Sequence, residues 1–283
     1  MKISLIMATL GRIDEIKIFL DSLIIQDYKN FELIIVDQNE ENILEEIVSS
    51  YKEKIYINHI RIDKKGLSVA RNVGMKYATG EIIAFPDDDC AYSKGILTFV
   101  SKFFNTNDNF DFVTFKLRDI EKGVDSNLRW YNHNVEITYK NIFRTVISPS
   151  IFIKFRDKSD VFFDENLGVG RKFGSGEESD MVLELLYRGY RGIFLTDFVI
   201  HHPDKNESIE KICLYGLGYG AILKKHVKLR NGKGFILNYL IKDSIFKPII
   251  GIIINVFKFD YCKIDFYKKR MISRIKGYLE YEN

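Results

Sequence analysis

The sequence predicts an α/β fold with a mostly parallel central sheet and helices on both of its faces. Two observations predict this class. Short apolar runs typical of buried strands alternate with segments of helical periodicity through the first third of the chain, and polar residues directly follow three of these runs. In a sheet built from right-handed βαβ units, ligands bind beyond the carboxyl ends of the strands. We therefore expect the three polar strand ends to line one crevice.

The first part of the chain divides into clear elements. Apolar runs and helical spacing predict strands at 2–8, 31–36, 55–60 and 81–85, and helices at 13–23, 40–51 and 66–78. The first strand ends at Thr9-Leu10-Gly11-Arg12, the second at Asp37, and the fourth at three consecutive aspartates. Each of these polar groups is expected at the same edge of the sheet.

The three aspartates, Asp87, Asp88 and Asp89, follow an apolar strand. Like charges this close together destabilise one another unless a cation lies between them. An Asp-x-Asp pair can hold Mg²⁺ or Mn²⁺ while water and a substrate diphosphate take the other positions. A solvated acidic turn is the alternative, and the preceding apolar strand favours the metal site.

Beyond Cys90 the alternation weakens. We expect a helix at 93–104, a strand at 110–117, a polar loop at 119–134, a bent or edge strand at 146–155 with Pro149 inside it, a glycine-rich loop at 168–176, an amphipathic helix that follows, and strand structure at 192–200. That last segment ends at His201 and His202. Imidazole is an acceptable ligand for Mn²⁺, and alternation along a strand lets only one of two neighbours point inward.

The totals describe a protein with a sizeable core. The chain has 283 residues, of which 46% are apolar. Its three cysteines, Cys90, Cys213 and Cys262, are far apart, so buried thiols are expected and neither a disulfide framework nor a zinc site is indicated. We expect a cytoplasmic, soluble protein, because the start lacks the pattern of a signal peptide and no apolar run reaches the ~18 residues of a spanning helix.

Charge separates the chain into two predicted parts. Residues 1–206 hold 27 Lys and Arg against 32 Asp and Glu, whereas residues 207–283 hold 15 against 7, a net charge of +8. We expect a catalytic domain at 1–206 and a basic, mainly helical extension at 207–283. Two interpretations of the extension stay open: helices packed on the domain, and a basic amphipathic surface at the inner face of a membrane. No motif indicates nucleic-acid binding.

Six blocks of sequence together resemble family 2 glycosyltransferases of the GT-A fold. They are Thr9–Arg12, Val36–Asp37, Gly66–Gly74, Ala78–Asp89, Gly174–Asp180 and His201–Pro203, in the family's order and spacing. The resemblance covers roughly residues 1–205. It implies a GT-A nucleotide-diphospho-sugar-binding fold and a donor site formed by Thr9, Gly11, Arg12, Asp37, Arg71, Asp87 and Asp88. It also implies Mn²⁺ or Mg²⁺ held by Asp87, Asp89 and one histidine, for which we favour His202 over His201.

Two of these assignments have structural alternatives. Arg71 could pair with Asp37 or Asp63, and Thr9 could cap the first helix. The sequence also departs from the family after Asp37, because many relatives read Asp-Asp-Gly-Ser where this chain reads Asp37-Gln38-Asn39. This departure concerns the contact with the base of the nucleotide.

The resemblance implies that Glu178 is the general base that removes the proton of the acceptor hydroxyl. The alternative is a capping box, since Ser175-Gly176-Glu177-Glu178 fits the pattern S-x-x-E. Glu177 is the second candidate for the base, and Asp180 is expected to face the acceptor. We expect Arg171 and Lys172 to close over the diphosphate, with a solvated loop as the alternative.

The expected function is transfer of a sugar from a nucleotide diphosphate donor, with a UDP-sugar favoured, to a saccharide hydroxyl with inversion. Similar proteins build bacterial surface polysaccharides, so a lipid-linked acceptor is one possibility that the resemblance carries. Two other classes stay open: a nucleotidyltransferase, which also uses an acidic metal site, and a non-catalytic protein that binds sugar or lipid.

Overall fold

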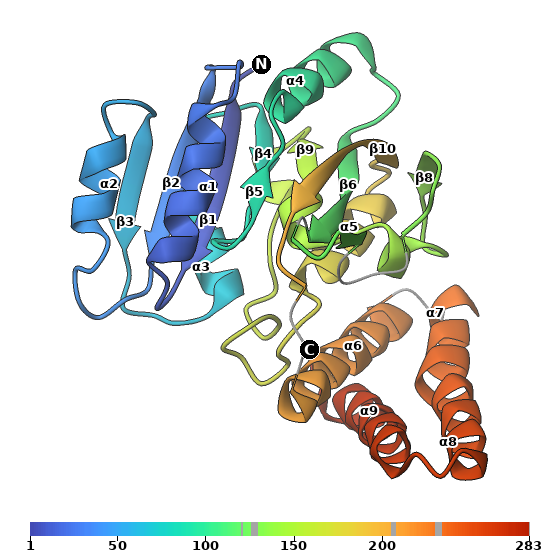
Figure 1. The fold of residues 1–283 in the computed structure, drawn as a ribbon. Helices are drawn as coiled ribbons and strands as arrows, with labels where there is room; N and C mark the ends of the chain where they lie inside the picture. The colour runs from blue at the N-terminus through green and yellow to red at the C-terminus, as the bar shows by residue number, and fades with distance from the viewer. Residues whose placement is uncertain (120, 126–129, 205–207, 230–233, 283) are drawn as a thin grey trace. The chain divides into compact units, whose positions relative to one another are not determined.

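The computed structural model describes residues 1–282 except 120, 126–129, 205–207 and 230–233 (Figure 1). It has a ten-stranded sheet with helices around it and helices at the C-terminal end, which confirms the predicted fold class. The chain forms two compact units: Met1–Phe163 with Met181–Lys205, and Asp164–Asp180 with Asn206–Asn283. The predicted boundary between residues 206 and 207 lies outside the described residues.

The first unit starts with the predicted alternation of strands and helices. Its elements are β1 (Ile3–Thr9), α1 (Asp14–Ile24), β2 (Phe31–Asp37), α2 (Glu45–Tyr51), β3 (Ile57–Arg61), α3 (Leu67–Tyr77) and β4 (Ile82–Ala84). Every residue of β1 and β2 is buried, as expected for central parallel strands covered on both faces. The parallel register pairs Thr9 with Asp37, so the ends of these two strands lie side by side.

The remaining elements of the sheet are less regular. They are β5 (Ala91–Tyr92), α4 (Ile96–Thr106), β6 (Phe112–Asp119), β7 (Val124–Asp125), β8 (Val135–Ile137), β9 (Phe152–Lys154), α5 (Glu177–Tyr187) and β10 (Gly192–His201), with 3₁₀ turns η1 (Ile142–Arg144), η2 (Ser148–Ser150) and η3 (Lys158–Asp160). The main strand order is β3-β2-β1-β4-β9-β6-β10-β5. The sheet is parallel over β3-β2-β1-β4 and again between β6 and β10.

The strand predicted around Pro149 is not at an edge of the sheet. β9 lies between β4 and β6 and pairs with both in antiparallel fashion. Pro149 itself lies in the turn η2, before the strand begins. Its missing N–H therefore removes no hydrogen bond from the sheet, and the residues after it can take a central place.

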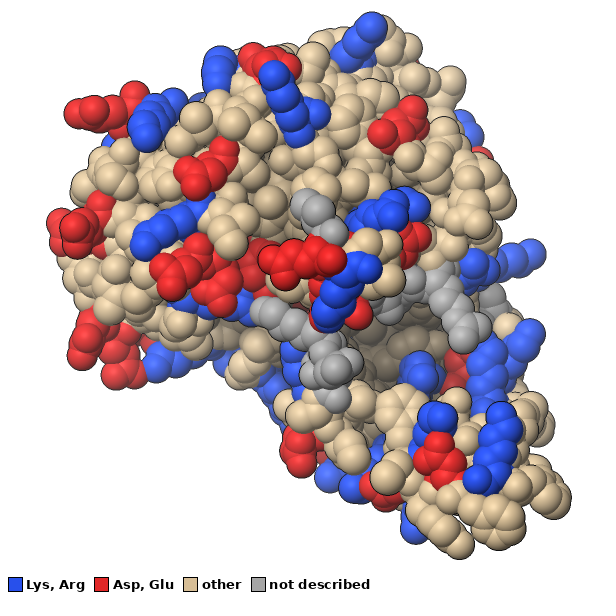
Figure 2. Space-filling view, in the orientation of Figure 1, with Lys and Arg blue, Asp and Glu red and all other residues tan. Residues whose placement is uncertain are grey.

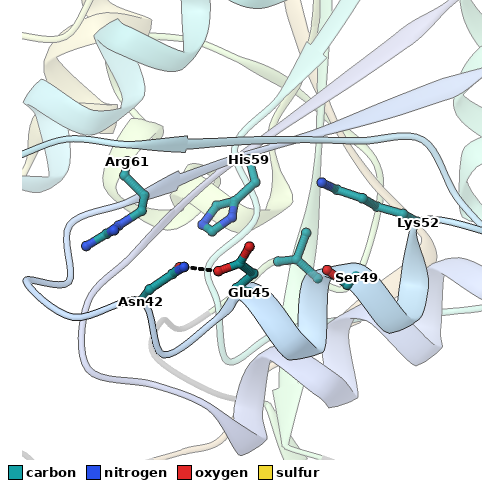
Figure 3. Close-up of a pocket in the computed structure, with 7 residues that line it drawn as sticks. Asn42, Glu45, Ser49, Lys52, His59 and Arg61 are labelled. Carbon is teal, nitrogen blue, oxygen red and sulfur yellow. Dashed lines mark hydrogen bonds between the residues drawn. The ribbon is translucent and has the colours of Figure 1, made fainter.

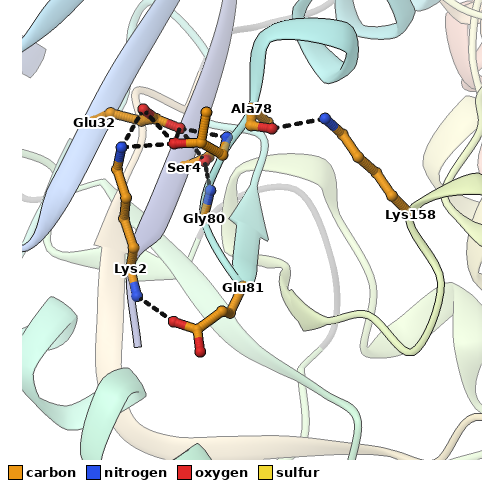
Figure 4. Close-up of polar contacts among 8 residues, drawn as sticks. Lys2, Ser4, Glu32, Ala78, Gly80, Glu81 and Lys158 are labelled. Carbon is orange, nitrogen blue, oxygen red and sulfur yellow. Dashed lines mark hydrogen bonds and ion pairs between the residues drawn. The ribbon is translucent and has the colours of Figure 1, made fainter.

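A polar cluster closes the end of the sheet where β1 and β2 begin (Figure 4). The buried carboxylate of Glu32 accepts hydrogen bonds from Lys2 Nζ at 2.6 Å, Ser4 Oγ at 2.6 Å and the backbone N of Thr79 at 2.7 Å. Burial raises the pKa of Glu32, but these donors outweigh burial and hold it below its ordinary value. Gly80 fits beside the cluster because a Cβ there would lie 2.7 Å from Lys2 O.

The second unit contains the C-terminal helices, which agree with the predicted helical extension. They are α6 (Ile209–Leu229), α7 (Gly234–Asn238), the π-helix η4 (Tyr239–Phe246), α8 (Lys247–Phe257) and α9 (Tyr261–Glu280). Helices α6 and α9 approach closely through glycines: a Cβ on Gly220 would lie 2.0 Å from Arg274 O, and one on Gly277 would lie 2.1 Å from Leu217 O. In the part of the chain that the structure describes, none of the helices combines the length and the apolar content of a membrane-spanning segment.

Candidate functional site

The aspartates after β4 continue the sheet alongside β1. Asp87 forms a parallel bridge with Ala8, which places the triplet next to the end of β1. The Thr9 hydroxyl, which is buried, donates to Asp88 Oδ2 at 2.8 Å. Thr9 therefore does not cap the first helix, whose N-cap is Ile13 without a side-chain cap bond.

Arg12 lies against two of the three carboxylates. Its Nη1 is 2.7 Å from Asp88 Oδ1 and 2.6 Å from Asp89 Oδ2. Burial raises the pKa of Asp88 to about 6, although Arg12 and the Thr9 hydroxyl act in the opposite direction. The structure thus brings together the donor-site residues predicted from the first and fourth strand ends.

Arg71 supplies a second guanidinium from α3. Its side chain is 1% exposed, and its Nη2 is 2.9 Å from Asp87 Oδ1. The guanidinium lies over the ring of Phe163, 5.3 Å from the centroid. An arginine held in this way is fixed in position beside Asp87.

Asp87, Asp89 and His202 form a group that could hold a metal ion. One ligand atom of each lies within 4.8 Å of the others. Nε2 of His202 is 3.4 Å from Asp89 Oδ1 and 4.0 Å from Asp87 Oδ2. Two carboxylate oxygens and one imidazole nitrogen are a donor set that suits Mn²⁺, so these residues fit the predicted ion.

His201 does not belong to this group. Its Nε2 is 3.0 Å from Ser93 Oγ, and burial lowers its pKa. His201 ends β10, where it pairs with Ala91 and Arg118, whereas His202 follows the strand. Adjacent residues along an extended chain point to opposite sides, which explains why only one histidine reaches the aspartates. The alternative assignment of His201 as a metal ligand is therefore not supported by the geometry.

Asp37 is fully buried at the end of β2. Its Oδ1 accepts hydrogen bonds from the backbone N and Nδ2 of Asn39, at 2.8 and 2.7 Å, and its Oδ2 is 3.0 Å from His59 Nε2. Asn39 Oδ1 in turn accepts a bond from the backbone N of Gly11 at 2.7 Å. The chain's departure from the family pattern therefore has a structural role, because Asn39 holds the turn after β1.

The side chain of Gln38 holds the turn at the start of α3, as Asn39 holds the turn after β1. Its Oε1 accepts a hydrogen bond from the backbone N of Gly66 at 2.7 Å. Gly66 has φ +134°, a conformation that L side chains rarely adopt. The predicted contact of Asp37 with a base stays a prediction.

A pocket of about 210 Å³ lies between α2 and β3 (Figure 3). It is lined by Asn42, Glu45, Val48, Ser49, Lys52, His59 and Arg61. His59 links this pocket to the buried Asp37. No motif in the sequence indicates this pocket, because a histidine and an arginine within a strand are ordinary surface residues until the fold is known.

The acids at the start of α5 belong to the second unit. Glu177 is buried and Glu178 is partly exposed. The Ser175 hydroxyl donates to Tyr215 O in α6 at 3.1 Å. Gly176 has φ +89°, and a Cβ there would lie 2.1 Å from Ile222 Cδ1, so the turn requires glycine. The acidic turn therefore packs closely on α6.

Asp180 is held in a buried network rather than left open toward an acceptor. Its carboxylate accepts a bond from Lys225 Nζ at 2.7 Å and lies 2.9 Å from His226 Nε2. Lys225 also donates to Asp164 at 2.9 Å, and the Tyr281 hydroxyl donates to Asp164 at 2.6 Å. Burial lowers the pKa of Lys225, but attraction to the two aspartates outweighs it and raises that pKa. The prediction that Asp180 faces the acceptor does not agree with these contacts.

The two basic residues of the glycine-rich loop are also engaged within the second unit. Arg171 Nε donates to Glu165 O at 2.5 Å, and Lys172 Nζ is 3.1 Å from Glu280 Oε2. Lys172 is 60% exposed, so it keeps the freedom to change partner. Closure of either residue over a diphosphate stays a prediction.

The first part of the chain is similar in sequence to known glycosyltransferases. The model of the family described as Glycosyl transferase family 2 matches residues 4–163. An uncharacterized glycosyltransferase of Rickettsia felis is 34% identical over 123 residues, which are 43% of this chain and 20% of that protein. The poly(ribitol-phosphate) beta-N-acetylglucosaminyltransferase TarS of Staphylococcus aureus is 25% identical over 215 residues, 73% of this chain and 36% of TarS. The chain spans about a fifth of the length of the first curated relatives it matches.

Two solved structures share the fold. The S. aureus TarS 1-349 complex with UDP-GlcNAc has a TM-score of 0.61 at 20% identity, covering 98% of this chain and 92% of that one. The mannosyltransferase PcManGT from Pyrobaculum calidifontis, in complex with GDP-Man and Mn²⁺, has a TM-score of 0.66 at 14% identity, covering 99% of this chain and 87% of that one.

Proposed function

Because the chain belongs to glycosyl transferase family 2, we propose that it transfers a sugar from a nucleotide diphosphate donor to a saccharide hydroxyl, with inversion at the anomeric carbon. The observation that carries this proposal is the group formed by Asp87, Asp89 and His202 beside two buried or half-buried arginines. Such a group suits a substrate whose leaving diphosphate gains negative charge during the reaction. The structures of TarS with UDP-GlcNAc and of PcManGT with GDP-Man and Mn²⁺ support the same class of donor.

Asp87, Asp89 and His202 would hold Mn²⁺ or Mg²⁺. When bound, the ion supplies positive charge to the leaving diphosphate. Arg71 and Arg12 add two guanidinium groups that keep the neighbouring carboxylates fixed. We favour a UDP-sugar as donor because TarS, which covers 73% of the chain in sequence, was solved with UDP-GlcNAc.

Glu178 is our proposed general base, with Glu177 as the second candidate. The carboxylate takes the proton of the acceptor hydroxyl while the acceptor oxygen forms a bond to the anomeric carbon. The bond from that carbon to the diphosphate breaks in the same displacement, and its electron pair leaves with the diphosphate. Glu178 suits this step better than Glu177 because it is partly exposed, whereas Glu177 is buried.

Asp180 and Lys225 are proposed as positioning residues. Asp180 follows Glu178 in the first turn of α5, and its carboxylate is fixed by Lys225 and His226. A buried and fully bonded network restricts the backbone around it. The network therefore supports a fixed backbone position for Glu178.

The acceptor in this proposal is a saccharide of a bacterial surface polymer, carried by a lipid. The named substrate of TarS, poly(ribitol-phosphate), supports a polymer acceptor. A lipid-linked acceptor would place the protein in the cytoplasm at the inner face of the membrane, with the C-terminal extension in contact with it.

Incubation with radiolabelled UDP-sugars and Mn²⁺ tests the activity. We expect release of UDP and transfer of label to a saccharide acceptor. Formation of pyrophosphate from UTP and a sugar phosphate would instead identify a nucleotidyltransferase and overturn the proposal.

Substitution of the base separates an enzyme from a binding protein. Glu178→Gln should lower turnover by about 10²- to 10⁴-fold while donor affinity stays unchanged. Glu184→Gln, in the same helix, is the matched control and should keep activity. If the wild type binds a UDP-sugar but neither it nor the control turns over, the protein is a non-catalytic binder.

A further inference from the structure

Helix α8 buries small and polar side chains and exposes apolar ones, which is the opposite of a normal surface helix. The residues it buries are Pro248, Gly251 and Asn255. Gly251 packs so closely on α9 that a Cβ would lie 2.7 Å from the ring of Tyr267, and Asn255 Nδ2 donates to Gly251 O at 2.7 Å. Small and polar side chains thus make the contact with the protein, where a water-exposed helix would place its apolar stripe.

The apolar side chains of α8 point outward instead. They are Ile249, Ile250, Ile253, Ile254, Val256 and Phe257, with exposed fractions from 38% for Ile249 to 80% for Phe257. The surface continues over the turn to α9, where Phe259 is 76% exposed. Single exposed apolar residues are ordinary, but a contiguous apolar surface marks an interaction site. We call the outward side of α8 with Phe259 the isoleucine face.

Lysines border the isoleucine face at both of its ends. Lys242 and Lys247 precede it, Lys258 and Lys263 follow it, and all four are exposed. Lys247 pairs with Asp243 and Lys263 with Asp260, so four lysines stand against two aspartates and the border keeps a positive net charge. Figure 2 shows Lys and Arg side chains, with Asp or Glu between them, beside uncharged surface over α8 and α9. The whole extension carries 15 Lys and Arg against 7 Asp and Glu. An anionic surface is the electrostatic complement of such a border.

We propose that the isoleucine face lies on an anionic lipid bilayer, with α8 parallel to the membrane plane. An interfacial helix inserts its apolar side below the headgroups, and lysines at its ends reach the lipid phosphates. A bilayer is fluid, so it covers a convex row of isoleucine side chains without a matching groove. Two copies of α8 would bring their lysine borders together, which like-charge repulsion opposes, whereas an anionic bilayer attracts them.

Vesicle sedimentation with the full chain tests this proposal. The chain should pellet with vesicles that contain phosphatidylglycerol and phosphatidylcholine, and binding should weaken with added salt. Replacing Ile250, Ile253 and Phe257 by serine should lower vesicle affinity at least tenfold. The control Ile18→Ser removes an isoleucine that is 61% exposed in α1 and should leave binding unchanged.

A second variant separates the electrostatic contribution to vesicle binding from the contribution of apolar insertion. Lys258→Glu should weaken binding to phosphatidylglycerol vesicles and leave the weak binding to pure phosphatidylcholine unchanged. Equal binding by the triple serine variant and Ile18→Ser would overturn the proposal. So would a concentration-dependent dimer in sedimentation velocity that the serine variant abolishes, because the occupant would then be a second copy. The assay needs no nucleotide sugar, so its result does not depend on the proposed reaction.

Discussion

The two ends of the central sheet both bury carboxylates, but they balance them differently. Where β1 and β2 begin, the single carboxylate of Glu32 is surrounded by donors from Lys2, Ser4 and Thr79. At the opposite end, the three carboxylates of the aspartate triplet face the guanidinium groups of Arg12 and Arg71. Burial alone therefore does not distinguish a structural acid from a functional one.

The balance of charge makes the distinction. The Glu32 cluster holds its carboxylate ionised, because the donors keep its pKa below the ordinary value. In the triplet, three carboxylates lie side by side, and burial together with repulsion from Asp87 and Asp89 raises the pKa of Asp88 to about 6, against the opposite effect of Arg12 and Thr9. Neighbouring carboxylates that repel one another favour a cation between them.

The largest expected effect comes from removing a ligand of that cation. Asp89→Asn should lower turnover by about two orders of magnitude or more, because the leaving diphosphate loses part of its charge compensation. Titration with Mn²⁺ in the presence of UDP should show binding by the wild type and much weaker binding by the variant. Unchanged Mn²⁺ dependence in Asp89→Asn would show that the ion binds elsewhere.

A substitution at Glu32, at the other end of the sheet, should change stability and leave turnover unchanged. Glu32→Gln removes the charge from a bonded, buried acceptor and should lower the free energy of unfolding by about 1–3 kcal/mol. Donor binding and kcat should stay at the wild-type level below the melting temperature. Urea unfolding and steady-state kinetics measure the two effects, and a large fall in kcat would contradict the structural role of this cluster.

The buried network in the second unit gives an intermediate case. Its two carboxylates, Asp164 and Asp180, share the ammonium group of Lys225, and Tyr281 and His226 contact them as well. Asp180 also lies in the same helical turn as the proposed base. Lys225→Met should lower kcat about tenfold and leave the KM for the donor unchanged, since Asp180 loses its ammonium partner. Lys225→Arg should recover part of kcat. Lys224→Met, at the neighbouring position in α6, is the control, and equal losses in both methionine variants would remove the positioning role.

The smallest effect is a difference in pH dependence. Because the pKa of Glu32 is lowered in the folded state, its contribution to stability is present above the ordinary value of 4.5 and is lost as the pH falls through the folded value. Wild-type stability should therefore fall more steeply below pH 4.5 than that of Glu32→Gln. Parallel curves from thermal unfolding at several pH values would contradict this assignment.

Much of the site around the aspartate triplet was predictable, because it depends on local sequence patterns. An apolar strand that stops at Asp87, and another that stops at Thr9, are visible in the sequence, and the rule for parallel strands brings them together. The choice between His201 and His202 required the structure at the end of β10. Alternation along a strand predicts that only one of the two side chains faces the aspartates, but it does not predict which one. The central place of β9 was hidden because a three-residue strand carries little periodicity.

The network around Asp180 was not predictable from the sequence. Its members Asp164, Lys225 and Tyr281 lie far apart along the chain, and each alone looks like an ordinary surface residue. The reversed polarity of α8 did leave a signal. Ser244, Pro248, Gly251 and Asn255 recur at helical spacing among isoleucines, which indicates that the small residues form the packed side.

Arg12 has a further consequence at the triplet. Its guanidinium lies 2.6 Å from Asp89 Oδ2, while Asp89 Oδ1 faces His202. A divalent ion on Asp89 would therefore compete with a cation that the chain itself supplies. The affinity for the ion would then be reduced by repulsion from this guanidinium, so a chain without this arginine should hold the metal more tightly. Arg12 would in this way set the affinity of the site for the ion.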